Sequence, residues 1–146
     1  MSTFDIRFQR VVNAIPDVAF RHWVDADARR FWYAPDEGSR VAESRTDLRV
    51  GGSYLVSVVG PAGEPRYREE GVFEVVDPPH LLVYQQIMRL PDGSSVETRV
   101  TVTFEDHEGE TLVTLLDEGY PTEEQRDELE RGWPDFLNAY EQTVGL

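Results

Sequence analysis

The sequence predicts an α+β fold in which a curved antiparallel β-sheet wraps around one long C-terminal helix. Residues 122–144 carry apolar side chains at intervals of three and four, the spacing of one helical face. Residues 40–117 alternate between apolar and polar and are interrupted by short turns, as in a meander of strands. The helix presents Trp133, Phe136 and Tyr140, which need a broad apolar partner, and nearly everything upstream is strand-like.

Two short helices are predicted between the first strand and the rest of the sheet. Residues 4–12 alternate well enough to form that first strand. Ile15-Pro16-Asp17 is expected to open a helix, because Pro suits a first helical turn and Asp suits the positive end of the helix dipole. Asp25 is placed to cap a second helix that runs to about Phe31. Trp32-Tyr33-Ala34-Pro35 closes it, because the residue before proline resists the helical conformation.

Six further strands are predicted from residue 40 onward. Their expected ranges are 40–46, 53–60, 66–77, 81–90, 96–106 and 110–117. Range 96–106 has the clearest alternation of apolar and polar residues, which predicts a sheet with one buried and one solvent-exposed face. Gly51-Gly52 lies between two strands and lacks the Lys and the following helix of a phosphate loop. We therefore interpret it as a turn or bulge that needs a positive φ.

The C-terminal helix has start and stop signals and one internal conflict. Thr122 with Gln125 forms a capping box, Glu123-Glu124 complements the helix dipole, and Gly145 follows the last turn. Pro134 lies inside the helix, where it removes a hydrogen bond and crowds the preceding turn, at a cost of about 3 kcal/mol. The sequence therefore predicts a kink near residues 132–134, or a break into two helices there.

Composition excludes several classes of function. The 146 residues form one expected domain, 1–146, with 28 acidic and 14 basic side chains and a net charge of −14. Such an acidic surface repels nucleic-acid phosphates and anionic membranes. Every basic residue is Arg, so Lys-dependent covalent catalysis is excluded, and the absence of Cys excludes disulfides and thiolate metal sites. No apolar run is long enough to insert into a membrane and no signal peptide is visible, so a cytoplasmic location is expected.

The usual catalytic and cofactor motifs are absent. There is no G-x-S-x-G sequence. His22, His80 and His107 are far apart and lack the spacing of metal ligands, and we expect neither a metal nor a cofactor.

The aromatic side chains and one carboxylate are the best candidates for a site. Each aromatic residue taken alone suits a packed core, but a helix held on a curved sheet by bulky rings often leaves an apolar cleft for a small molecule. Asp117 shares strand parity with Val113 and Leu115 and could point into such a cleft. Alternatively, the strand ends before Asp117, and the carboxylate is solvated.

Residues Asp47 to Tyr54, in the order Asp-Leu-Arg-Val-Gly-Gly-Ser-Tyr, resemble the D-x-R-x-G-G-x-aromatic signature of AHSA-type proteins. These are relatives of the activator of the heat-shock-protein ATPase, within the START-like, Bet v-like (SRPBCC) superfamily. Further stretches match in order: 15–20, 31–35, 71–79, 101–105, and Gly132-Trp133 followed by Leu137 and Tyr140. The resemblance covers nearly the whole chain. Pro134 departs from the family pattern.

This resemblance implies a helix-grip fold with a cavity between the sheet and the C-terminal helix. In relatives this cavity holds lipids, sterols, polyketides or other apolar molecules. The proteins that the chain resembles also include polyketide cyclases, which use polar groups in the cavity. They include eukaryotic co-chaperones as well, which carry an additional N-terminal domain that these 146 residues do not show.

Our leading hypothesis is a protein that binds a small apolar or aromatic molecule. The expected contacts are Trp32, Phe73, Tyr84, Met88, Val113, Leu115, Trp133, Phe136 and Tyr140. The second hypothesis is a cyclase, aromatase or hydrolase in which Asp117 or Tyr140 acts as general acid or base. The third is an interaction module for a chaperone. A homodimer is a further possibility in each case.

Overall fold

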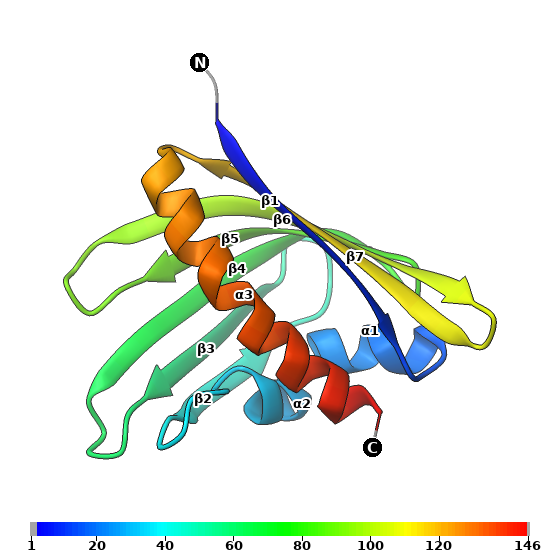
Figure 1. The fold of residues 1–146 in the computed structure, drawn as a ribbon, viewed down its shortest axis with the longest axis horizontal. Helices are drawn as coiled ribbons and strands as arrows, with labels where there is room; N and C mark the ends of the chain where they lie inside the picture. Colours follow the sequence, from blue (N-terminus) through cyan, green and yellow to red (C-terminus); the bar gives the residue numbers. More distant parts are fainter. Residues whose placement is uncertain (1–2, 146) are drawn as a thin grey trace.

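The computed structural model describes residues 3–145, which form seven strands and three helices (Figure 1). The strands are β1 (Phe4–Val12), β2 (Arg40–Thr46), β3 (Ser53–Val59), β4 (Pro65–Asp77), β5 (Leu81–Arg89), β6 (Ser95–His107) and β7 (Glu110–Tyr120). The helices are α1 (Pro16–Val24), α2 (Ala26–Trp32) and α3 (Glu123–Val144). All neighbouring strands are antiparallel, in the order β1-β7-β6-β5-β4-β3-β2. None of the helices in the described part of the chain has the length and apolar character of a membrane span.

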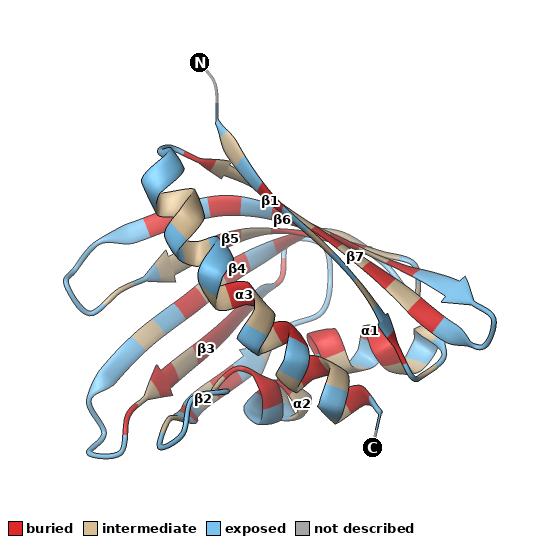
Figure 2. Cartoon of the chain, viewed as in Figure 1, coloured by how far each residue is buried: buried red, intermediate tan, exposed pale blue. Residues whose placement is uncertain are grey.

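The sheet curves around α3, and α1 and α2 close the end nearest the C-terminus of α3 (Figure 1). This arrangement confirms the predicted α+β fold and the two short helices after the first strand. Buried and less buried positions alternate along β6 and β7 (Figure 2), as expected for strands with one face toward the core. Gly51 has a φ of +82°, as expected for a turn between strands.

The core is rich in aromatic rings. Trp23 of α1 is fully buried. Its ring centroid lies 4.9 Å from that of Tyr140, 5.0 Å from that of Trp32 and 6.3 Å from that of Phe104. These contacts join α1, α2, β6 and α3 into one apolar cluster. Aromatic pairs in such edge-on and tilted arrangements add to the stabilisation that burial itself provides.

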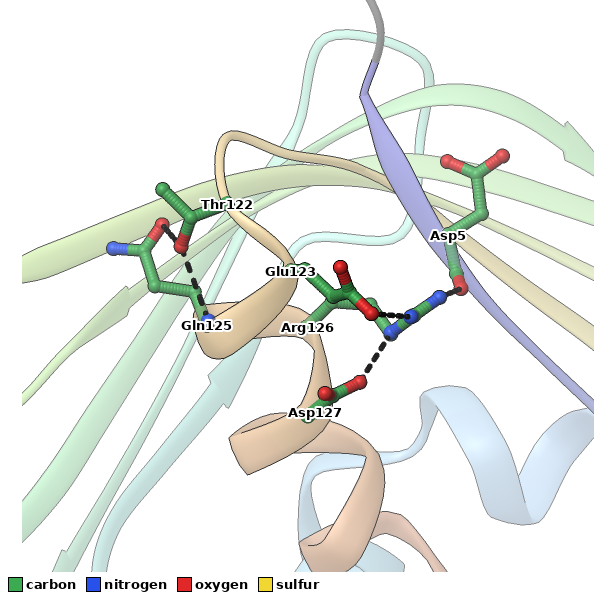
Figure 3. Close-up of polar contacts among 6 residues, drawn as sticks. All are labelled: Asp5, Thr122, Glu123, Gln125, Arg126 and Asp127. Atoms are coloured by element: carbon green, nitrogen blue, oxygen red, sulfur yellow. Dashed lines mark hydrogen bonds and ion pairs between the residues drawn. The ribbon is translucent and has the colours of Figure 1, made fainter.

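The N-terminus of α3 is capped and tied to the first strand (Figure 3). The side chain of Thr122 accepts a hydrogen bond from the backbone N–H of Gln125 at 3.1 Å, as predicted. The guanidinium of Arg126 donates to the backbone carbonyl of Asp5 at 3.3 Å and to Oδ1 of Asp127 at 2.7 Å. These bonds fix the start of α3 against β1.

Helix α3 continues through Pro134 without interruption. The predicted break into two helices is therefore wrong, while a bend without a break stays a prediction. Trp133 and Leu137, on either side of the proline, are buried against the core. Burying such side chains provides about 1.5–3 kcal/mol each, enough to offset the missing hydrogen bond.

Candidate functional site

A cleft of about 410 Å³ lies between the N-terminal half of α3 and the sheet. Its apolar lining consists of Trp32, Met88, Leu90, Leu129, Trp133 and Phe136, and Tyr33, Asp36, Arg66, Tyr67, Glu69, Glu128 and Gly132 complete it. A Cβ atom added to Gly132 would meet no atom within 4 Å, so the helix leaves open space at this position. The charged residues Asp36, Arg66 and Glu128 are exposed and form the mouth of the cleft.

Glu69 of β4 is the carboxylate in the wall of the cleft and is only 4% exposed. The hydroxyls of Tyr33 and Tyr54 both donate to Oε2 of Glu69, at 2.8 Å and 2.7 Å. Oε1 receives no hydrogen bond from residues 3–145. Because a carboxylate can accept several hydrogen bonds, Oε1 is free to bind a ligand group.

Gly71 explains how Tyr54 reaches Glu69. Gly71 pairs with Tyr54 across β3 and β4. A Cβ atom at Gly71 would lie 2.1 Å from Cε1 of Tyr54 and 2.5 Å from the carbonyl oxygen of Gln85. The glycine therefore makes room for the tyrosine ring, whose hydroxyl then meets the carboxylate two residues along β4.

Burial raises the pKa of Glu69. The hydrogen bonds from Tyr54 and Tyr33 and the nearby cation of Arg29 oppose this rise, whereas the charge of Asp117 adds to it. Burial also raises the pKa of Tyr33 and Tyr54, and the neighbouring Glu69 adds to the effect. The two tyrosines therefore stay protonated and act as donors.

Arg29 of α2 is fully buried beside this cluster. It donates from Nε to the carbonyl oxygen of Trp23 at 3.0 Å and from Nη1 to Oγ1 of Thr46 at 3.3 Å. Nη2 is buried and has no hydrogen-bond partner within residues 3–145. Its Cζ lies 4.4 Å from the ring centroid of Tyr54, a cation–π contact. None of the ion pairs formed by the described residues involves Glu69, so Arg29 acts on it without direct contact.

Asp117 of β7 forms a second buried acidic group. Strand β7 extends to Tyr120, so Asp117 lies within it and is fully buried, and the alternative of a solvated carboxylate is wrong. Tyr120 and Trp133 donate to Oδ2 of Asp117, the latter from Nε1 at 3.3 Å. Oδ1 of Asp117 and Oε1 of Gln86 are buried and have no hydrogen-bond partner in the described part of the chain. Burial raises the pKa of Asp117, and the polar side chains of Thr98, Tyr120 and Trp133 oppose that rise.

The structure brings four of the nine predicted contact residues to the cleft. These four are Trp32, Met88, Trp133 and Phe136. The other five, Phe73, Tyr84, Val113, Leu115 and Tyr140, are at most 2% exposed and lie in the core outside the cleft lining. Their role in ligand binding stays a prediction.

The two predicted acid or base candidates also lie outside the cleft lining. Tyr140 donates its hydroxyl to the carbonyl oxygen of Ala19 at 2.6 Å. Asp117 is connected to the cleft through Trp133, which lines it. Their catalytic role stays a prediction. No group of three or more potential metal ligands occurs within residues 3–145.

Glu69, Tyr33 and Arg29 were not predicted from the sequence as site residues. A usable signal for Glu69 was its strand parity with Gly71 and Phe73, which places it on the inner face. Its position in the charged run Arg68-Glu69-Glu70 made a solvated surface the simpler interpretation. No comparable signal marks Arg29, because burial of a helix Arg depends on how α2 packs.

Comparison with known protein families identifies the chain. The family described as "Activator of Hsp90 ATPase homolog 1-like protein" (AHSA1) matches residues 13–145. The chain belongs to this family. The resemblance that the sequence motifs indicated is therefore confirmed. No curated protein matches the chain.

Solved structures similar to this AHSA1 chain show the same fold. A crystal structure of a protein from Chromobacterium violaceum has a TM-score of 0.83 and 24% identity, with 97% of each chain covered. The solution structure of an AHSA1-like protein from Aeromonas hydrophila has a TM-score of 0.76 and 23% identity, covering 97% of this chain and 92% of that one. A protein from Mycobacterium smegmatis has a TM-score of 0.77 and 17% identity, covering 99% and 94%. These likenesses confirm the helix-grip fold.

Proposed function

We propose that this AHSA1 chain binds a small apolar or aromatic molecule in the cleft between α3 and the sheet. The observation that carries the proposal is a cleft of about 410 Å³ with aromatic and aliphatic walls and a buried carboxylate, Glu69, in its lining. Small-molecule sites typically have volumes of roughly 300–1,000 Å³, mainly apolar walls and few polar groups.

A direct test uses the neutral fluorescent probe N-phenyl-1-naphthylamine. Saturable binding to the wild-type protein, with one probe per chain, is expected. Gly132→Leu should abolish this binding, because the new side chain extends into space that is empty next to the helix. Gly132→Ala is the matched control, since a single methyl group leaves most of the cleft open. An absence of saturable binding, or equal binding by the Leu variant, would contradict the proposal.

An enzymatic role is a second candidate, and Glu69 favours it. Glu69 lines the cleft and burial raises its pKa, two properties of a general acid or base. Hydrolysis of p-nitrophenyl acetate measures this activity. If the cleft is catalytic, the protein should hydrolyse the ester faster than buffer alone. The Glu69→Gln and Gly132→Leu variants should both lose this additional rate. A rate unchanged by both substitutions would exclude catalysis of this reaction by the cleft.

A chaperone interaction is a third candidate. It is supported by membership of the AHSA1 family and by three exposed apolar side chains, Leu48, Val50 and Val72. The turn that carries Leu48 and Val50 is held next to Val72, because the N–H of Gly51 donates to the carbonyl oxygen of Phe73 at 2.8 Å. Stimulation of purified Hsp90 ATPase, lost in Val50→Asp, would support this role.

The cytoplasmic location and the homodimer stay predictions.

A further inference from the structure

We infer that the molecule bound in this cleft carries a protonated amine on its aromatic or apolar body, and that the amine binds Oε1 of Glu69. This inference rests on the proposed function and specifies the class of ligand. A cleft with only apolar walls would accept amines, fatty acids and other carboxylates equally well. A carboxylate in the wall favours the amines.

The hydrogen bonds to Glu69 involve only one of its two carboxylate oxygens. Both tyrosine donors bind Oε2, and Oε1 has no donor among the described residues. Oε1 is not one of the fully buried atoms without a partner, so it keeps some exposure in a residue that lines the cleft. Glu69 also lacks a salt bridge to any described Arg. An ionised carboxylate oxygen that is open to the cleft can accept a hydrogen bond from a bound molecule, and a charged donor forms a stronger hydrogen bond than a neutral one.

The buried charged side chains include more acidic than basic groups. Among the described residues, the buried charged side chains are Arg29, Glu69 and Asp117. Two potential anions therefore face a single cation in the interior. A buried charge is costly unless it is paired, so either one carboxyl group binds a proton or a cation enters. An ammonium group at Glu69 supplies the missing positive charge.

The charged side chains at the mouth of the cleft also favour a cation. Asp36 and Glu128 are both exposed there, while Arg66 lies 3.8 Å from Glu64 and is partly neutralised. The net charge of the chain is −14. The long-range field therefore attracts cations and repels anions. Carboxylate ligands would meet an unfavourable potential both at the mouth and beside Glu69.

The test compares three probes of similar shape by isothermal titration calorimetry. They are 2-(2-naphthyl)ethylamine, the neutral 2-(2-naphthyl)ethanol, and the anionic 3-(2-naphthyl)propanoate. We expect the amine to bind roughly 10- to 100-fold more tightly than the alcohol, the range that a charge-assisted hydrogen bond provides. The propanoate should bind most weakly.

Glu69→Gln keeps the shape of the side chain and removes its charge. It should weaken the amine to about the affinity of the alcohol and leave the alcohol unchanged. Glu105→Gln is the control, because Glu105 is an exposed residue on β6 that forms no ion pair with residues 3–145. This substitution changes the net charge by the same amount as Glu69→Gln. An equal loss of amine affinity in both variants would indicate non-specific attraction and overturn the inference.

A measurement on the wild-type protein covers the case in which Glu69→Gln does not fold. The ¹³C resonance of the Glu69 side-chain carboxyl group should move when the amine is added and stay in place with the alcohol. Binding of the alcohol as tightly as the amine would overturn this inference while the proposed function stands. If neither these probes nor the neutral fluorescent probe binds, the proposed function itself fails.

Discussion

Trp133 donates its indole N–H to Oδ2 of Asp117 over 3.3 Å, while its ring forms part of the cleft wall. One side chain of α3 therefore links the cleft to a carboxylate buried on β7. Oδ1 of the same carboxylate has no hydrogen-bond partner among the residues that the structure describes. Changes in the ionisation of Asp117 should consequently affect the stability of the fold and the position of the cleft wall.

Asp117→Asn is expected to stabilise the protein relative to the wild type increasingly as the pH rises. The folded-state pKa of Asp117 is raised above its ordinary value of 3.8 by burial. Below pH 3.8 the carboxyl group of Asp117 is protonated in both the folded and the unfolded protein, and the neutral group is tolerated in the buried site. As the pH rises through the raised pKa, ionisation destabilises the folded state.

Urea unfolding of both proteins between pH 4 and pH 8 measures this difference in the free energy of unfolding. Glu105→Gln serves as the control for a surface carboxylate. A difference between Asp117→Asn and the wild type that stays constant over this range would show that Asp117 does not titrate with a raised pKa.

Trp133→Phe removes the indole donor and keeps an aromatic ring in the cleft wall. Loss of a hydrogen bond to a buried carboxylate should lower the free energy of unfolding by about 1–3 kcal/mol at pH 8. Combined with Asp117→Asn in a double-mutant cycle, the two substitutions should show a coupling energy of about 0.5–3 kcal/mol. Additive effects of the two substitutions would argue against this link.

Gly71→Ala should destabilise the fold by about 1–3 kcal/mol, because the added methyl group must displace the ring of Tyr54 or the backbone of β5. Chemical denaturation measures this loss. Gly132→Ala is a contrasting control: it adds the same methyl group in a helix where no atom lies within 4 Å, so it should stabilise the fold by about 0.5–1 kcal/mol. Similar effects of both changes would contradict the assigned role of Gly71.

Pro134→Ala should raise the free energy of unfolding by up to about 3 kcal/mol, because the new N–H can donate to the carbonyl oxygen of Glu130. Thermal and urea unfolding provide the measurement. A neutral or negative effect would mean that α3 has adjusted its path to accommodate the proline, which is the bend still predicted at residues 132–134.

The elements of the fold could be predicted from local patterns. The strand alternation, the Asp25 cap and the Thr122 cap each depend on a few neighbouring residues, and the structure reproduces all three. The continuity of α3 through Pro134 was harder to predict. It depends on how strongly Trp133 and Leu137 pack against distant parts of the chain, and a helical pattern does not measure that energy.

The candidate site could be predicted only in part. Trp133 and Phe136 were expected at the cleft because they lie on the apolar face of a helix that must cover the sheet. Glu69 was missed because its burial depends on Tyr33 and Tyr54, which come from α2's end and β3. Residue types alone do not reveal that two hydroxyls from distant segments meet one carboxylate.

The strand order also has a consequence for the order of folding. Strands β2 to β7 form a chain of hairpins, whereas β1 joins the sheet beside β7, where Phe8 pairs with Leu115. Pairing β1 with β7 closes a loop that contains all the elements between these two strands. This closure loses more chain entropy than forming a hairpin, and non-local pairings of this kind slow folding. We therefore expect β1 to dock late and its amide hydrogens to exchange before those of the central strands. Since Arg126 ties the start of α3 to Asp5, opening of β1 would also loosen the entrance to the cleft.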